Sequence, residues 1–216
     1  MNYQITQWCA HFITEHVKEG DLCIDATMGN GNDTLLLSRL CGEKGHVLAF
    51  DIQELALAHT RERLEKENAA HNYELILDSH ANMGNYAAPM SVNCIVFNFG
   101  YLPGGDHSLA TRPDSSILAL QASLGLLKKG GILMLCIYSG GDSGFEERDA
   151  LLSWLKEISG NQNRILQPSQ QSAYACACSK TITSASALYL IKNFVQPKPH
   201  STNCAGRSWT KHRLQM

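Results

Sequence analysis

The sequence lacks several features that would exclude an ordinary soluble enzyme. No apolar run approaches the roughly 18 residues of a membrane span, and the N-terminus has no signal-peptide pattern. The first absence argues against a membrane-embedded chain, and together the two lead us to expect a cytoplasmic protein. There is no internal repeat. The 216 residues, 44% of them hydrophobic, suffice for one domain with a sizeable core, which we assign to residues 1–194.

Eight cysteines are present, but the sequence lacks the paired spacing of a metal centre. Cys176-Ala-Cys178 is the only close pair, and it has neither a second pair nor a neighbouring histidine. We therefore predict no metal. Five others are scattered through expected helices and strands and are interpreted as small buried hydrophobes in a reducing cytosol: Cys9, Cys23, Cys41, Cys94 and Cys136.

Acidic residues are absent from the last part of the chain. Residues 1–157 hold all 20 acidic residues and 11 of the basic ones, whereas residues 158–216 hold seven basic residues and no acid. This basic end favours a phosphate-contacting surface for RNA beside an acidic body. The alternative is a solvated, poorly ordered tail, which we assign to residues 195–216. A homodimer is compatible with the sequence, which does not set the oligomeric state.

Helical and extended patterns alternate along the chain, which indicates an α/β fold with a mostly parallel sheet and helices on both faces. An amphipathic helix is expected first, near residues 5–17. Further helices are expected near 33–42, 53–69, 114–128 and 144–159. Strands are expected near 21–26, 46–51, 73–77, 92–97, 131–138 and 187–194, with a weaker one between 163 and 178. Polar clusters follow four of these strands, where the active residues of such sheets lie.

The most informative segment runs from Asp25 to Thr34 and reads Asp-Ala-Thr-Met-Gly-Asn-Gly-Asn-Asp-Thr. It joins a buried strand to a helix through a tight glycine turn. Gly29 and Gly31 let the backbone approach a ligand, and the helix start offers free N–H groups. Asp51 ends the next strand, about 20 residues on, where an acid accepts hydrogen bonds from ribose hydroxyls. These features predict a nucleotide-type cofactor site. The alternative is a plain strand–turn–helix without a ligand.

One missing glycine separates two kinds of cofactor. A dinucleotide-binding fingerprint needs a third glycine where Thr34 stands, so a pyrophosphate is disfavoured. Asn30, Asn32 and Asp33 make the loop rich in acceptors and acidic, which suits the cationic methionine end of S-adenosylmethionine. We therefore predict S-adenosylmethionine as the cofactor.

The third polar cluster, after the strand at 73–77, is expected at the adenine edge, with Gln53 close to the ribose. The alternative is a polar strand end with no role. The residues that we assign to the cofactor site are Asp25, Gly29, Asn30, Gly31, Asn32, Asp33, Asp51, Gln53, Asp78, Ser79 and His80.

The fourth cluster is predicted to be the catalytic loop. A buried strand ends in Asn98-Phe-Gly-Tyr-Leu-Pro-Gly-Gly-Asp-His-Ser108. An asparagine followed three residues later by Tyr101 resembles the N-P-P-Y corner of amine-directed methyltransferases, in which the amide oxygen accepts from the attacking amine. Asp106, and with it His107, is expected to face the substrate. The alternative is a structural turn with exposed polar tips.

Together these motifs resemble a family of small class I methyltransferases long labelled "putative rRNA methylase". The resemblance covers roughly residues 1–150 and rests on Asp25–Thr34, Phe50-Asp-Ile-Gln53 and Asn98–Asp106. It implies a Rossmann-like, seven-stranded sheet with a reversed last hairpin and no metal. It also implies methylation of 5-aminomethyl-(2-thio)uridine at the tRNA wobble position. The cofactor contacts that it suggests are Asn30, Asn32, Asp51, Gln53, Ser79 and His80.

The expected mechanism is direct transfer of a methyl group to a neutral amine. An alkylammonium has a pKa of about 10.4, so it must lose a proton first. Asp106 is the candidate proton acceptor, Asn98 aims the lone pair, and Tyr101 stacks on the uracil. Alternatives are an rRNA or small-molecule amine methyltransferase, a nicotinamide oxidoreductase, or a non-catalytic RNA-binding protein.

The chain departs from the family pattern on the substrate side. Gly140-Gly141 replaces a Gly-His pair, His107 stands where relatives often carry lysine, and the stretch 167–186 lacks their Asn-rich, Pro-Pro segment. These departures concern the choice of substrate and leave the cofactor prediction intact.

Overall fold

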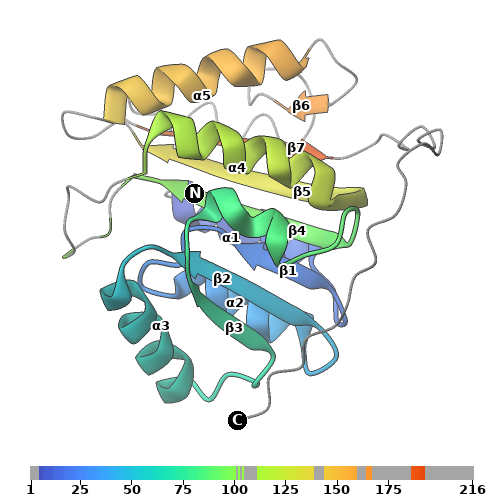
Figure 1. Ribbon diagram of the computed structural model, residues 1–216. Coiled ribbons are helices and arrows are strands. Elements are labelled where there is room, and N and C mark those ends of the chain that lie inside the picture. The colour runs from blue at the N-terminus through green and yellow to red at the C-terminus, as the bar shows by residue number, and fades with distance from the viewer. Residues whose placement is uncertain are drawn as a thin grey trace, which may run out of the picture.

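A computed structural model describes residues 5–100, 102, 104, 111–138, 144–159, 164–166 and 186–192. Figure 1 shows the helices and strands along the chain. In order they are α1 (Ile5–His16), β1 (Leu22–Asp25), α2 (Asn32–Cys41), β2 (His46–Asp51), α3 (Glu54–Lys66), β3 (Tyr73–Leu77), the 3-10 helix η1 (His80–Asn85), β4 (Val92–Phe99), α4 (Pro113–Leu126), β5 (Leu127–Tyr138), α5 (Gly144–Ser159), β6 (Arg164–Leu166) and β7 (Ser186–Lys192).

Each predicted helix and strand has a counterpart, but two strand boundaries differ in ways that matter, and one short helix is additional. The strand predicted over 92–97 continues to Phe99, so Asn98 lies within the sheet and not beyond it. β5 begins at Leu127, directly after α4. The short helix η1 was not predicted; Ser79 caps it by accepting from the Ala81 N–H at 3.2 Å.

The strands form one sheet in the order β3-β2-β1-β4-β5-β7-β6. The first five are parallel, whereas β7 is antiparallel to β5 and β6 is antiparallel to β7. The chain order reverses between β1 and β4, and parallel sheets bind their ligands at such a switch point. The predicted parallel sheet is thus confirmed, and it places the ends of β1 and β4 side by side.

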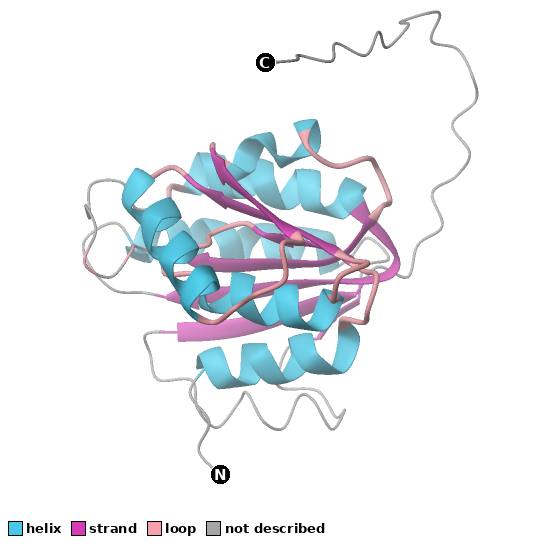
Figure 2. Cartoon of the chain, turned by 90° about the horizontal axis from the view of Figure 1, so that it is seen from below, coloured by secondary structure: helices cyan, strands magenta, loops and turns pink. Residues whose placement is uncertain are grey.

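Helices cover both faces of the sheet (Figure 2), and neighbouring residues of each strand serve opposite cores. Ile24, Leu48 and Ile95 belong to the cluster that packs against α4 and α5. Their neighbours Cys23 and Val47 belong to the cluster under α1 and α2. Both faces are therefore closed by apolar packing, and the strand ends are left for polar side chains.

The five cysteines predicted to be buried are buried and free. No group of three metal-ligand side chains occurs within the described ranges, and none of the helices described is long and apolar enough to cross a membrane. Cys176, Cys178 and the basic tail lie outside the described residues, so the predictions about them, and the domain limits, stay predictions.

Candidate functional site

A cavity of about 1020 Å³ opens at the carboxyl ends of the parallel strands. Its walls come from the segments after β1 to β4, the end of β5, the first turn of α4, and α1. Ten residues predicted for the site line this cavity: Gly29, Asn30, Asn32, Asp33, Asp51, Gln53, Asp78, Ser79, His80 and Asn98. The described structure thus brings together four clusters that are far apart in the sequence.

The glycine loop after β1 is held from behind by α3. Gly31 has φ 75°, and a Cβ there would lie 2.9 Å from the backbone of Thr60. Thr60 Oγ1 donates to the Gly29 carbonyl at 3.1 Å, and Arg63 Nε donates to the Asn30 carbonyl at 2.6 Å. Gly31, which does not line the cavity, therefore serves close packing between loop and helix.

Asp51 faces the same loop from the end of β2. Its carboxylate accepts the N–H of Gly29 at 3.1 Å and the N–H of Gln53 at 3.0 Å. Burial raises the pKa of Asp51, although these bonds act to lower it. Asp51, which we predicted to bind the ribose, therefore also holds together the loop after β1 and the segment after β2.

Asp25 lies behind the cavity wall, fully buried, and not at the cavity as the sequence had suggested. Its carboxyl accepts the Thr34 hydroxyl at 2.6 Å and the Thr27 N–H at 3.3 Å. Thr34 is fully buried as well. The threonine that replaces the third glycine thus ties the first turn of α2 to the end of β1, a long-range role that local spacing does not show.

Asp25 should make the protein less stable as pH rises from about 4 to about 7. Burial, and then the nearby charge of Asp33, raises the pKa of Asp25 from 3.8 to about 7. The folded state keeps a proton that the unfolded chain releases, so this stabilisation is complete below 3.8 and is lost as pH rises through about 7. In Asp25→Asn the slope should shrink, as urea denaturation at about pH 5 and about pH 8 can measure. An unchanged pH dependence would contradict this assignment.

At one end of the cavity lie Asp78, Ser79 and His80. The Asp78 carboxylate accepts from Asn82, Tyr86 and the Ser79 N–H, and the Asn82 side-chain bond is the largest cause that lowers its pKa. Burial lowers the pKa of His80 to about 4, so its ring is neutral at neutral pH. Its Nε2 is buried without a hydrogen-bond partner. In the tautomer that carries its proton on Nδ1, this neutral ring offers Nε2 as a hydrogen-bond acceptor for a bound ligand.

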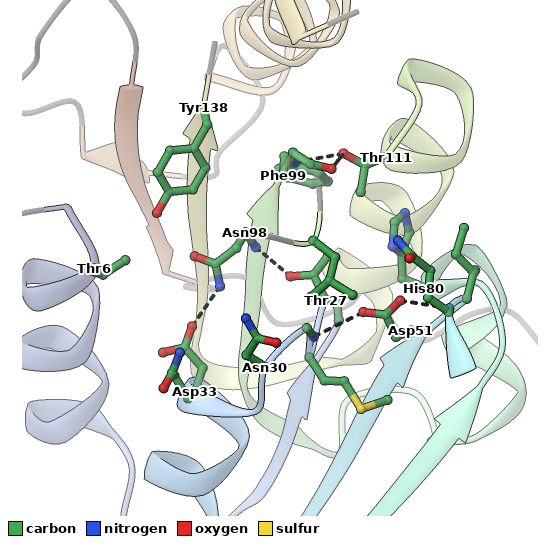
Figure 3. A pocket seen from close by; sticks show the side chains of 18 of the residues that line it. Thr6, Thr27, Asn30, Asp33, Asp51, His80, Asn98, Phe99, Thr111 and Tyr138 are labelled. Atoms are coloured by element: carbon green, nitrogen blue, oxygen red, sulfur yellow. Dashed lines mark hydrogen bonds between the residues drawn. The ribbon is translucent and has the colours of Figure 1, made fainter. Parts of the chain in front are cut away.

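At the other end Asn98 meets the start of α2. Its Nδ2 donates to Asp33 Oδ2 at 2.7 Å, and its backbone N–H donates to Thr27 Oγ1 at 2.7 Å. Figure 3 shows Thr6 and Tyr138 on the same side, with Asp51 and His80 opposite. Because the amide nitrogen is engaged by Asp33, the amide oxygen remains to accept from a ligand.

Sequence reasoning missed several side chains that build this site. Tyr138 at the end of β5 and Thr6 of α1 line the cavity, and burial raises the pKa of the Tyr138 hydroxyl. Thr60 and Arg63 hold the loop from α3. The sequence did contain one signal for them: Thr60 and Arg63 are three residues apart in the predicted helix, so they lie on the same helix face. Tyr101, Asp106 and His107 lie outside the described residues, as do Gly140 and Gly141, so their placement stays a prediction.

The sheet order, the glycine loop after β1 and the acid after β2 define the Rossmann-like methyltransferase fold. The chain belongs to the family described as "Putative rRNA methylase", whose family model matches residues 47–182. This confirms the resemblance drawn from the motifs.

Three relatives illustrate the match. The chain is 38% identical over 154 residues to a chloroplastic tRNA (mnm(5)s(2)U34)-methyltransferase of Arabidopsis thaliana, covering 66% of this chain and 56% of the relative. It thus spans about half the length of that protein. A putative rRNA-methylase structure from Clostridium thermocellum is 38% identical, with a TM-score of 0.79 over 89% of this chain and 98% of that one. A putative methyltransferase from Streptococcus mutans, in complex with SAH, is 34% identical, with a TM-score of 0.72 over 89% and 99%.

Proposed function

We propose that this protein is an S-adenosylmethionine-dependent methyltransferase that methylates the exocyclic amine of 5-aminomethyl-(2-thio)uridine at the tRNA wobble position. The observation that carries the proposal is the Asn98–Asp33 pair, which presents an amide oxygen at the end of the cavity opposite His80. The names of the relatives support both the substrate and the cofactor of this proposal: one relative is named for a tRNA uridine, and another is in complex with SAH.

The residues of the cavity fit this cofactor. The buried Nε2 of His80 lacks a donor, and the exocyclic amine of adenine would supply one. Asp51 has carboxylate oxygens for ribose hydroxyls, and Gly29 and Asn30 lie beside it. Asp33 brings negative charge near the expected sulfonium. When bound, S-adenosylmethionine supplies an electrophilic methyl group.

The protein's own task is then to orient and deprotonate the acceptor amine. The Asn98 oxygen accepts one amine hydrogen, which turns the nitrogen lone pair toward the methyl group. Asp33 prevents the amide from rotating, because a reversed amide would set its oxygen against a carboxylate. Asp106 remains the proposed proton acceptor, and Tyr101 the proposed stacking partner of the base.

Asp51→Ala should weaken binding of the donor by about 1–3 kcal/mol, because charge-assisted bonds to the ribose and to the Gly29 N–H are lost together. Titration calorimetry with S-adenosylmethionine and with NAD tests both the residue and the cofactor. Glu74→Ala, which removes an exposed acid of β3 away from the cavity, is the matched control. Tight NAD binding with no response to the methyl donor would sink the cofactor proposal.

The family description makes rRNA the second candidate substrate. A location in the cytoplasm, a homodimer and RNA contact by the basic tail stay proposals; the Arabidopsis relative is chloroplastic by name.

A further inference from the structure

A buried carboxylate on α5 lies behind the cavity wall and has no part in the chemistry above. Glu147 is only 3% exposed and does not line the cavity. It accepts the Thr111 hydroxyl at 2.7 Å and the Ser116 hydroxyl at 2.6 Å. Burial raises the pKa of Glu147. An apolar side chain would fill this buried position at a lower desolvation cost, so stability alone does not account for a carboxylate here.

Thr111 connects this carboxylate to the strand that carries Asn98. The Gly100 N–H donates to Thr111 Oγ1 at 3.0 Å, and the Thr111 N–H donates to the Gly100 carbonyl at 3.1 Å. Gly100 is the second residue after Asn98, and both Gly100 and Thr111 line the cavity. Figure 3 shows Thr111 against the chain beside Phe99.

The direction of these bonds depends on the carboxylate. A hydroxyl has one proton, and the closest acceptor of the Thr111 proton is Glu147. With its proton committed there, the oxygen of Thr111 turns a lone pair toward the Gly100 N–H. The result is a directed chain from Gly100 through Thr111 to Glu147. It closes the cavity wall between two residues that lie eleven positions apart.

We propose that Glu147 is a positioning residue, which fixes Thr111 and through it Gly100, so that the wall next to Asn98 keeps one geometry during turnover. This inference rests on the function proposed for Asn98. Ser116 forms the other bond to Glu147, but its described hydrogen bonds do not reach Gly100, and it does not line the cavity. Removing the Thr111 hydroxyl therefore tests the positioning of Gly100, whereas removing the Ser116 hydroxyl tests the effect of a lost Glu147 bond on stability alone.

The test compares Glu147→Leu and Thr111→Val with Ser116→Ala. The first two should lower kcat by roughly 10- to 100-fold, as misplacement of reacting groups does, with KM for the acceptor changed less. The double variant Glu147→Leu with Thr111→Val should be no slower than Thr111→Val alone, because both changes break one chain. Ser116→Ala should lose stability but keep kcat near wild type. Equal kcat in Glu147→Leu and Ser116→Ala would overturn the proposal.

Hydrogen exchange at the Gly100 amide gives a second readout that needs no substrate. Its protection should fall in Glu147→Leu and Thr111→Val and persist in Ser116→Ala. If the wild-type enzyme fails to methylate tRNA, the proposed function fails, while the exchange rates still decide the inference. Unchanged protection in Glu147→Leu would contradict the chain of bonds.

Discussion

Replacing Asn98 with alanine should lower turnover by roughly 100-fold or more while leaving donor affinity near wild type. The side chain makes no described hydrogen bond to Asp51 or to the glycines of the loop; its one described side-chain bond goes to Asp33, at the start of α2. Asp33 keeps its charge and its place in the helix in this variant, so donor affinity should change little. The acceptor amine, however, loses the oxygen that orients its lone pair, and orientation sets much of the barrier.

Asp33→Asn should act in the same direction through Asn98. An amide at position 33 can pair with either orientation of the Asn98 amide, so the oxygen is no longer forced toward the acceptor. Asp106→Asn tests the proposed base in the same assay, because it removes the charge and retains most of the shape.

Asn93→Ala is the matched control for Asn98, since it removes an asparagine at the opposite end of β4. Asn93 donates to Asp21 and accepts from the Leu22 N–H, both far from the cavity. This variant should lose stability but keep kcat. Single-turnover kinetics and donor calorimetry measure the two effects separately. Near-normal turnover of Asn98→Ala and Asp106→Asn, with the donor bound normally, would show that the segment Asn98–Asp106 takes no part in the mechanism.

Gly31→Ala should be the most damaging single change in the glycine loop, with a loss of about 2–4 kcal/mol of unfolding free energy. The residue has φ 75°, which costs an L-residue with a side chain about 1–2 kcal/mol. The new Cβ would also lie 2.9 Å from the Thr60 backbone, so α3 or the loop must move. Donor affinity should fall as well, because this contact holds Gly29 and Asn30.

Gly20→Ala separates the cost of backbone strain from the cost of a steric clash. Gly20 has φ 85°, but a Cβ there meets nothing within 4 Å. It should lose only the conformational part, about 1–2 kcal/mol, and leave donor binding unchanged. Chemical denaturation of both variants gives the comparison. Equal losses at the two glycines would show that the packing of loop against α3 contributes nothing.

Local patterns predicted every α-helix and strand that the structure describes, though not the 3-10 helix η1, and they predicted ten of the residues that line the cavity. The reason is physical: apolar periodicity, glycine turns and polar strand ends are written in consecutive residues, and parallel strands bring those ends to one edge. The Asn98–Asp33 bond was not predicted, because it joins residues 65 positions apart and depends on which strands are neighbours.

The same limit explains the residues that were misplaced or missed. Asp25 stood in the most informative motif, yet its carboxyl turns inward to Thr34, which only the packing of α2 against β1 decides. Tyr138 and Glu147 belong to segments whose patterns indicate a buried strand and an amphipathic helix. No neighbouring residue in the sequence indicates that Tyr138 lines the cavity, or that Glu147 accepts the hydrogen bonds behind its wall.

The central claim is tested most directly by incubating the purified protein with S-adenosylmethionine and tRNA that carries 5-aminomethyluridine or its 2-thio form at the wobble position. Mass spectrometry of the digested nucleosides should show one added methyl on that uridine with the wild type, and almost none with Asn98→Ala. Parallel reactions with rRNA fragments and free amines should stay unmethylated. Methylation of either of these, with the tRNA unchanged, would contradict the account.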